Sequence, residues 1–223
     1  FHPKDVRITT RFHENNVNDA LGSTMHECGH AIYEQGLRQD QAGLPLGTSV
    51  SLGIHESQSR LWENQVGRSR QFWQWCFPKL SEYFGSDASS LDLDSVYCGA
   101  NIVRPDFIRV EADEATYNMH IMIRFELERA LLKGDLAVAD VPTAWAEKYR
   151  DYLGIEVPCD SKGCLQDIHW SMVSMGYFPT YTLGNLYSAQ FFDAAKREIP
   201  GLEDGFAKGE FGPLKTWLNE KIH

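Results

Sequence analysis

The residues best suited to chemistry lie in the segment Met25–Ala31, which reads Met-His-Glu-Cys-Gly-His-Ala. It holds two histidines four residues apart, and side chains at that spacing lie on one face of an α-helix, one turn from each other. His26 and His30 can therefore present two imidazoles to a single ion. Glu27 projects about 100° further round such a helix, beside the ion rather than in line with the ligands. The pattern predicts a metal site with a carboxylate next to it.

Such a site is suited to the activation of water. Zinc held by two histidines and a third protein ligand keeps one coordination position open for a water molecule. The ion lowers the pKa of that water, and a nearby carboxylate can accept its proton. We therefore expect Glu27 to act as a general base. Because so short a motif also occurs by chance, this interpretation depends on a helix to carry it and on a third ligand.

The best candidate for the third ligand is Glu56, in the segment His55–Arg60. This segment begins a second amphipathic stretch, and residues 39–47, which are rich in turn formers, separate it from the first. A helix–loop–helix arrangement would bring Glu56 back over the histidines. Two histidines and one glutamate are a known catalytic zinc set. Near Glu56 on the same helix side, Ser59, Arg60 or Glu63 could orient a ligand, or the charged pair could form an exposed salt bridge.

The elements that must position these residues are predicted to be mainly helical. Asn16 or Asn18 can cap the first helix, and Gly36 can end it. A short strand is expected over residues 1–12, because Val6, Ile8 and Thr10 alternate with charged or polar neighbours. The polar stretch 79–95 is expected to be a loop. The other expected helices cover about 51–77 (ending before Pro78), 140–154, 180–196 and 213–222. Between the first two of these, a further helix is expected to end at Lys133–Gly134.

The composition is that of an ordinary globular protein. Its 223 residues, 43% hydrophobic and 23% charged, suffice for one large domain or two small ones. A net charge of −10 makes nucleic acid and anionic membranes unfavourable partners. The chain has no apolar run of about 18 residues, so no membrane span is expected. Five cysteines without a disulfide pattern indicate reduced thiols in the cytoplasm, with a bridge between Cys159 and Cys164 as the less favoured alternative.

Another segment is dense in groups that could polarise a carbonyl. It runs from Leu165 to Tyr181 and contains one imidazole, His169, and two phenols, Tyr177 and Tyr181. Hydrogen-bond donors of this kind stabilise an oxyanion. Spacing alone does not choose between the two tyrosines.

Five motifs in order make the sequence resemble the carboxypeptidase Taq family of thermostable metallocarboxypeptidases. They are Asp5–Thr9, His26–His30, His55–Arg60, Ile108–Asp113 and Gly163–Trp170. The resemblance covers nearly the whole chain, and the sequence of its first residues is most similar to the protozoan-type members. Family members are longer and carry a His-Pro-Phe motif just before the first of these segments. The resemblance therefore implies that residues 1–223 are the C-terminal catalytic portion of a single metallocarboxypeptidase domain whose N-terminal half is absent.

The resemblance also implies a fold and an activity. The fold would be mainly α, the C-terminal part of a helical cleft similar to neurolysin and angiotensin-converting enzyme, with at most a small β-sheet. The full-length enzyme would be a homodimer that uses Zn²⁺ or Co²⁺ to release single amino acids from the C-termini of peptides. Since the absent half would supply one wall of the groove, activity of the fragment alone does not follow.

The family's functional residues can be carried over by position. His26, His30 and Glu56 resemble the metal ligands, Glu27 the general base, and His169 the group that stabilises the tetrahedral intermediate, with Tyr177 or Tyr181 beside it. Arg7 and Arg109 are candidates for the substrate's terminal carboxylate, because an arginine can bind a carboxylate through two parallel hydrogen bonds. From the residues alone, Arg7 could equally be a solvated charge on an edge strand.

Two rival functions remain open from the sequence. One is a peptidyl-dipeptidase or oligo-endopeptidase on the same scaffold, which would release dipeptides or internal fragments. The other is a helical domain that a metal only stabilises. Glu27 argues against the second, because a structural metal site has no use for a base between its ligands.

Overall fold

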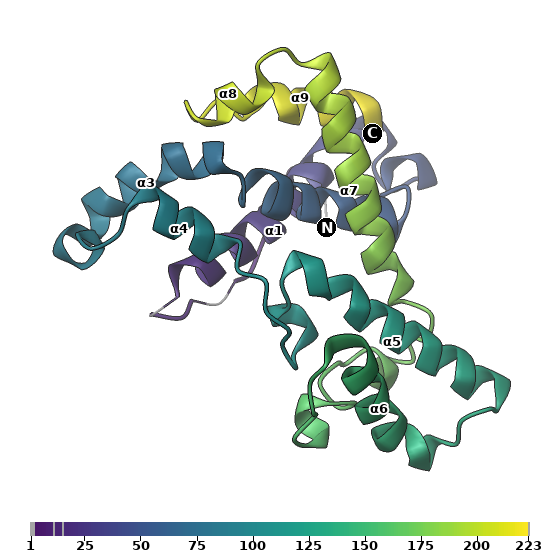
Figure 1. Cartoon of the computed structure of the whole chain (residues 1–223). Helices are drawn as coiled ribbons and strands as arrows, with labels where there is room; N and C mark the ends of the chain where they lie inside the picture. The colour runs from purple at the N-terminus through teal and green to yellow at the C-terminus, as the bar shows by residue number, and fades with distance from the viewer. Residues whose placement is uncertain (1–2, 11, 15, 223) are drawn as a thin grey trace. The chain divides into compact units, whose positions relative to one another are not determined.

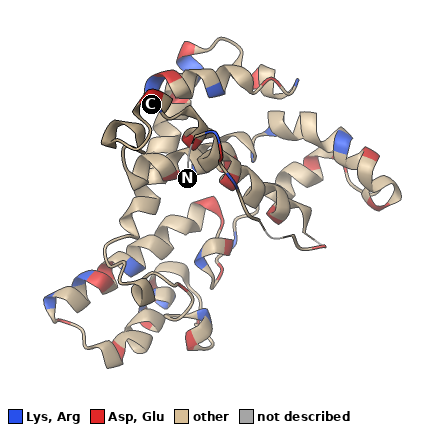
Figure 2. Cartoon of the chain, turned by 180° about the vertical axis from the view of Figure 1, so that it is seen from behind, with Lys and Arg blue, Asp and Glu red and all other residues tan. Residues whose placement is uncertain are grey.

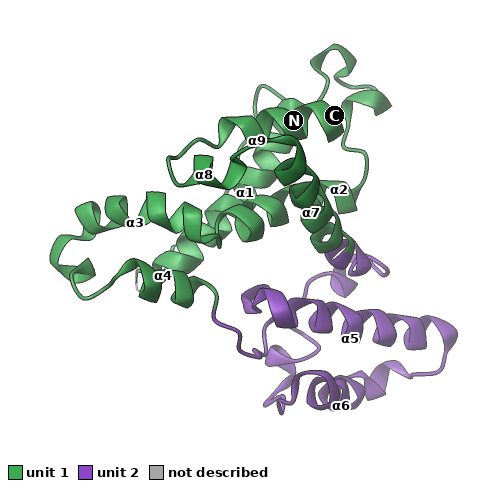
Figure 3. Cartoon of the chain, turned by 45° about the horizontal axis from the view of Figure 1, so that its top comes forward, with its two compact units in different colours: residues 1–101, 183–223 green, residues 102–182 purple. Residues whose placement is uncertain are grey.

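The structure is a computed structural model that describes residues 3–10, 12–14 and 16–222. Its described part is helical and contains no β-strand (Figure 1). The prediction of a mainly α fold is thus confirmed. The chain divides into two compact units (Figure 3): unit 1 comprises Phe1–Asn101 and Leu183–His223, and unit 2 comprises Ile102–Thr182.

Unit 1 contains the predicted histidine helix and the segment that carries Glu56. Its elements are α1 (Val17–Gly36), α2 (Leu52–Arg60), a π-helical turn (Leu61–Val66), α3 (Arg70–Phe84), α4 (Leu93–Ala100), most of α7 (Pro179–Glu198), α8 (Leu202–Phe206) and α9 (Gly212–Ile222). Short polar side chains cap α1, α2, α3 and α4 at their N-termini. Asn16 Oδ1 accepts from the Asp19 amide at 3.1 Å, and Ser51 Oγ accepts from the Ile54 amide at 3.1 Å.

Apolar packing explains why the second predicted helix has different bounds. The expectation of one helix over 51–77 followed by a loop over 79–95 was wrong, because the chain turns at Gly67 and restarts as α3, which Ser69 caps. Pro78 lies inside α3, and the helix continues past it to Phe84. Phe72, Trp73 and Cys76 of α3 are buried in the core of unit 1. Packing of this kind outweighs the local cost of a proline.

The strand expected near the N-terminus is not formed in the described residues. Residues 6–10 have no regular structure, and Asp5 makes only an isolated bridge. The ends of the expected strand at Phe1, His2 and Arg11 lie outside the described residues. Arg7 donates from Nε to Asp5 Oδ1 at 2.8 Å, and its side chain is 80% exposed. The charged side chains of Asp5 and Arg7 thus pair with each other, and this segment forms no strand within the described residues.

Unit 2 is organised around α5 (Glu114–Lys133) and α6 (Val141–Leu153). Asp113 Oδ1 caps α5 by accepting from the amides of Ala115 and Thr116 at 2.8 and 2.9 Å. Gly134 and Gly154 end the two helices with φ of 79° and 69°, as the sequence predicts. Ile123, Leu127 and Leu153, with the aromatic rings of α6, form the apolar core between these helices.

A buried histidine in unit 2 makes the stability of this unit depend on pH. His120 is fully buried and its Nδ1 lies 3.0 Å from Tyr149 Oη. Burial, with the charges of Arg124 and Arg109, lowers the pKa of His120 from 6.5 to about 4. Because the unfolded chain binds a proton at higher pH than the folded chain, we expect unit 2 to lose stability as the pH falls from 6.5 to about 4. Integrated over this window, the loss is roughly 3 kcal/mol.

The measurement is urea unfolding across that pH window, with fluorescence of the tryptophans of unit 2 as the probe. The variant His120→Asn, whose amide can replace Nδ1 at Tyr149, should be less stable but should lose this part of the slope. An unchanged slope in His120→Asn would assign the acid sensitivity to other groups.

Acidic and basic residues are interspersed along the helices (Figure 2). Among the helices that the structure describes, none has both the length and the apolar character needed to cross a bilayer. All five cysteines are free thiols, so the alternative bridge between Cys159 and Cys164 is not formed.

Candidate metal centre

Two glycines allow the helices around Glu56 to approach closely. A Cβ on Gly29 of α1 would lie 2.6 Å from the carbonyl oxygen of Gln58 and 2.6 Å from Cα of Ser59, so α1 and α2 touch backbone to backbone. A Cβ on Gly184 of α7 would lie 2.7 Å from Cγ of Glu56. These contacts hold Glu56 between the two helices, on the side of α2 that faces the histidines.

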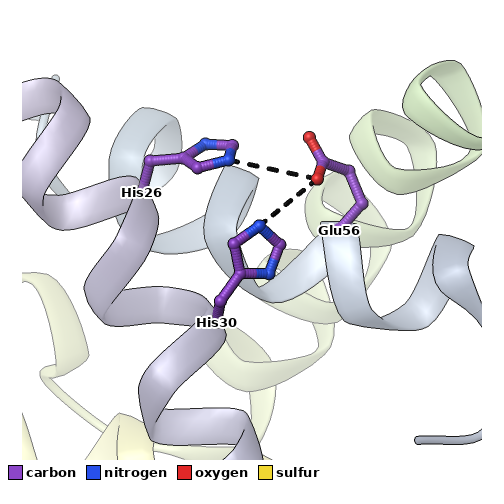
Figure 4. Close-up of side chains that lie close together, drawn as sticks. All are labelled: His26, His30 and Glu56. Atoms are coloured by element: carbon purple, nitrogen blue, oxygen red, sulfur yellow. Dashed lines mark ion pairs between the residues drawn. The ribbon is translucent and has the colours of Figure 1, made fainter. Parts of the chain in front are cut away.

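The three side chains of the predicted site meet in the structure. Figure 4 shows both imidazoles of α1 turned toward the Glu56 carboxylate. Oε2 of Glu56 lies 4.0 Å from Nε2 of His26 and 3.5 Å from Nε2 of His30. Among the described residues, these are the only three His, Cys, Asp or Glu side chains whose ligand atoms gather within 4.8 Å. The sequence expectation that Glu56 folds back over the histidines agrees with this geometry.

The spacing of these atoms fits a divalent ion. Zinc–ligand distances of about 2.0–2.2 Å at a tetrahedral angle place two ligand atoms about 3.4 Å apart. The separations of 3.5 and 4.0 Å between the Glu56 oxygen and the two histidine nitrogens lie close to that value. Two imidazole nitrogens and one carboxylate oxygen suit zinc and cobalt alike. The residues present therefore fit the group that the motif predicts.

A second carboxylate orients His26. Oε2 of Glu63 lies 2.8 Å from Nδ1 of His26, which leaves Nε2 directed at Glu56. Metal-bound histidines commonly use their other ring nitrogen in this way. Arg60 joins the two carboxylates, because it donates from Nε to Glu56 Oε1 at 3.1 Å and from Nη1 to Glu63 Oε2 at 3.3 Å. With side chains only 12% and 15% exposed, Arg60 and Glu63 are not the exposed salt bridge that the sequence left open.

The charges of this cluster keep Glu56 ionised. Burial disfavours its carboxylate, but the hydrogen bond to His30 and the charges of His26 and Arg60 lower the pKa of Glu56 to about 2. Burial also disfavours a charged His26, yet the hydrogen bond and the charge of Glu63 raise the pKa of His26. A carboxylate that is ionised at neutral pH is the form that binds a cation. Glu27 is partly buried on α1, and its role as general base stays a prediction.

The residues predicted to stabilise the oxyanion belong to unit 2, where Tyr181 is hydrogen-bonded to His169. Nε2 of His169 lies 2.9 Å from Oη of Tyr181. The Tyr177 ring lies 5.2 Å from the His169 ring and 5.4 Å from the Tyr181 ring, measured between centroids. Burial and the charge of Arg109 lower the pKa of His169. A neutral imidazole bonded to Tyr181 is therefore the form present near neutral pH.

Arg109 is buried and has partners within unit 2. It is 5% exposed, donates from Nη2 and Nε to Asp167 Oδ1 at 2.8 and 3.0 Å, and donates from Nη1 to Tyr117 Oη at 2.8 Å. Asp167 also accepts from Arg124 Nε at 2.6 Å. Binding of a substrate carboxylate by Arg109 stays a prediction, one that these contacts do not favour. The sequence interpretation gave no role to Asp167, although it lies inside the Gly163–Trp170 motif.

The glycines of α1 offer a matched test of the helix contact. Gly29→Ala is expected to lower the free energy of unfolding by about 2–3 kcal/mol, because its methyl group would meet the backbone of α2. Gly22→Ala on the same helix should instead raise it by about 0.5–1 kcal/mol, because alanine favours a helix and nothing lies within 4 Å of the added carbon. Thermal unfolding of both variants measures the difference. Equal effects would mean that α1 and α2 do not touch at Gly29.

Similarity to known proteins agrees with the motif assignment. The chain is 54% identical to thermostable carboxypeptidase 1 of Thermus thermophilus over 222 residues, which are 99% of this chain and 43% of that protein. The crystal structure of an M32 carboxypeptidase from Deinococcus radiodurans R1 superposes with a TM-score of 0.96 at 49% identity, covering 99% of this chain and 45% of that one. Metallocarboxypeptidase 1 of Trypanosoma cruzi gives a TM-score of 0.92 at 40% identity, covering 99% and 46%.

Each of these matches covers 99% of this chain. The chain spans less than half the length of the curated relatives that it matches. Within the chain, however, the match is complete, since residues 1–223 fit the family described as carboxypeptidase Taq (M32) metallopeptidase. The resemblance drawn from the five motifs is thus confirmed, and the chain belongs to the carboxypeptidase Taq (M32) metallopeptidase family.

Proposed function

We propose that this chain carries the metal centre of a carboxypeptidase that releases single amino acids from the C-termini of peptides. The observation that supports this most is the convergence of His26, His30 and Glu56 at the separations of ligands on one ion. Membership of a metallopeptidase family and relatives named as carboxypeptidases support the same proposal.

In this proposal each site residue has a distinct task. His26, His30 and Glu56 would hold one Zn²⁺ or Co²⁺ ion, which when bound supplies the positive charge that acidifies water and polarises the scissile carbonyl. Glu27 takes a proton from the attacking water and returns it to the leaving amine. We assign stabilisation of the oxyanion to His169 and a tyrosine, on the strength of the family resemblance. Tyr181 is preferred to Tyr177 because it is bonded to His169.

Recognition of the substrate's terminal carboxylate needs a cation that can bind it. The two candidates are Arg7 and Arg109. Arg7 is the more available, because its side chain is 80% exposed and its partner Asp5 is a surface residue. Arg109 would have to exchange buried bonds to Asp167 and Tyr117 for a bond to substrate.

Product analysis combined with metal analysis tests the function. The full-length protein, loaded with Zn²⁺ or Co²⁺, would be incubated with short N-blocked peptides. We expect one ion per chain and the free C-terminal amino acid as the first product. Dipeptides or internal fragments would favour the peptidyl-dipeptidase or oligo-endopeptidase alternative. Stoichiometric metal without any hydrolysis would favour a helical domain that the metal only stabilises.

Location and assembly are further parts of the proposal. Five free cysteines fit a reducing compartment, so we place the protein in the cytoplasm. The homodimer rests on the family resemblance alone. Light scattering on the full-length protein would measure its assembly directly.

A further inference from the structure

The two ligand histidines are supported in different ways. His26 is held by a hydrogen bond from its Nδ1 to Glu63, at 2.8 Å. Nδ1 of His30 is buried and has no hydrogen-bond partner among the described residues. Since a metal-bound histidine almost always uses its second nitrogen to fix the ring, another contact must orient His30.

The contact that His30 does have is an aromatic one with His55. The two imidazole centroids lie 4.5 Å apart with the ring planes tilted by 32°. His55 comes from α2, directly before Glu56, so the ring that faces His30 moves with the third ligand. Aromatic rings at such separations attract each other, so the His55 ring favours one orientation of the His30 ring.

His55 is itself held on two further sides. Its Nε2 lies 2.8 Å from Oε1 of Glu34, which is the residue one turn after His30 on α1. With a carboxylate as acceptor, Nε2 carries the proton and donates it. The Tyr33 ring stands edge-on to His55 at 5.3 Å and 86°, and Tyr33 is 1% exposed. His55 is therefore fixed by Glu34 and Tyr33 before it contacts His30.

We propose that His55, braced by Glu34, is a positioning residue for the metal ligand His30. The His55 ring orients His30, as the hydrogen bond to Glu63 orients His26. His55 also links α1 to α2, the helix that carries Glu56. The inference rests on the proposed metal centre. It implies that metal affinity depends first on the flat ring at position 55. The hydrogen bond from Nε2 of His55 to Glu34 contributes by holding that ring in place.

Two substitutions separate the ring from its hydrogen bond. His55→Phe keeps a flat ring but cannot donate to Glu34, whereas His55→Gln keeps a donor near the position of Nε2 but has no ring. We expect His55→Gln to weaken metal binding about tenfold, the lower end of the effect of losing an outer contact to a ligand. His55→Phe should weaken binding by clearly less, because its ring still faces His30 although the bond to Glu34 is lost. His13→Ala, at a histidine whose side chain is 70% exposed, is the control and should change nothing.

The readout is the dissociation constant of Zn²⁺, measured by chelator competition, together with the visible spectrum of the Co²⁺-loaded full-length protein. A turned His30 ring changes the Co²⁺ bands, whereas a loss of stability elsewhere does not. Equal weakening in His55→Phe and His55→Gln, or no weakening in either, would overturn the inference. Failure of the wild-type protein to bind Zn²⁺ or Co²⁺ would instead overturn the proposed function, so the two failures can be told apart.

Discussion

Replacing Glu27 by glutamine is expected to lower kcat by about a hundredfold to ten thousandfold while the metal stays bound. Glutamine keeps the size of the side chain but has no basic oxygen for the proton of the attacking water. Because Glu27 is not one of the three converging ligand side chains, metal content should be unchanged. Steady-state hydrolysis of a short N-blocked peptide and metal analysis of the same preparation measure the two effects together.

Glu56→Gln is the matched comparison. The same acid-to-amide change at a ligand should lower metal content and activity together, because the carboxylate oxygen lies 3.5 and 4.0 Å from the two histidine nitrogens. Full activity in Glu27→Gln would remove Glu27 from the mechanism. Full metal content in Glu56→Gln would remove Glu56 from the ligand set.

Local spacing predicted much of this centre. His26 and His30 could be paired because a helix repeats its faces every turn, and a helix needs only its own caps and apolar face to be identified. Asn16 and Gly36 marked that helix well. Glu56 was harder, since its approach to the histidines depends on the packing of α1 against α2 that Gly29 permits. Glu56 was chosen because the His26–His30 motif needs an acidic third ligand from another segment, and the structure brings its carboxylate to the two imidazoles.

Features that depend on tertiary contacts could not be read in the same way. Pro78 lies in the middle of α3, where local rules predict an end, because burial of neighbouring side chains favours the helix. Arg109 resembled a free cation in the sequence, yet its partner Asp167 lies 58 residues away along the chain. Glu34 could have been recognised from the sequence, because it lies one turn after His30 on the same side of the same helix, but it was given no role.

The buried charges of unit 2 lead to the second large effect, Asp167→Asn, which we expect to lower the free energy of unfolding by about 3–5 kcal/mol. Asp167 is the shared anion of Arg109 and Arg124, which are 5% and 0% exposed. Burial opposes its charge, but the two arginines lower the pKa of Asp167, so it is ionised near neutral pH. The amide would leave two buried guanidinium groups without a counter-ion, the costliest way to break such a cluster.

Glu156→Gln is the control for this change within the same unit. Glu156 pairs with Arg150 at 2.6 Å, but the two side chains are 71% and 56% exposed, and pairs this open to solvent contribute little to stability. Urea unfolding of both variants near neutral pH compares the buried and the exposed acid directly. Since a depressed carboxyl pKa stabilises the fold above its ordinary value of 3.8, the gap between wild type and Asp167→Asn should shrink as the pH falls below that value. If Asp167→Asn costs no more than Glu156→Gln, the arginines of unit 2 do not depend on Asp167 for their burial.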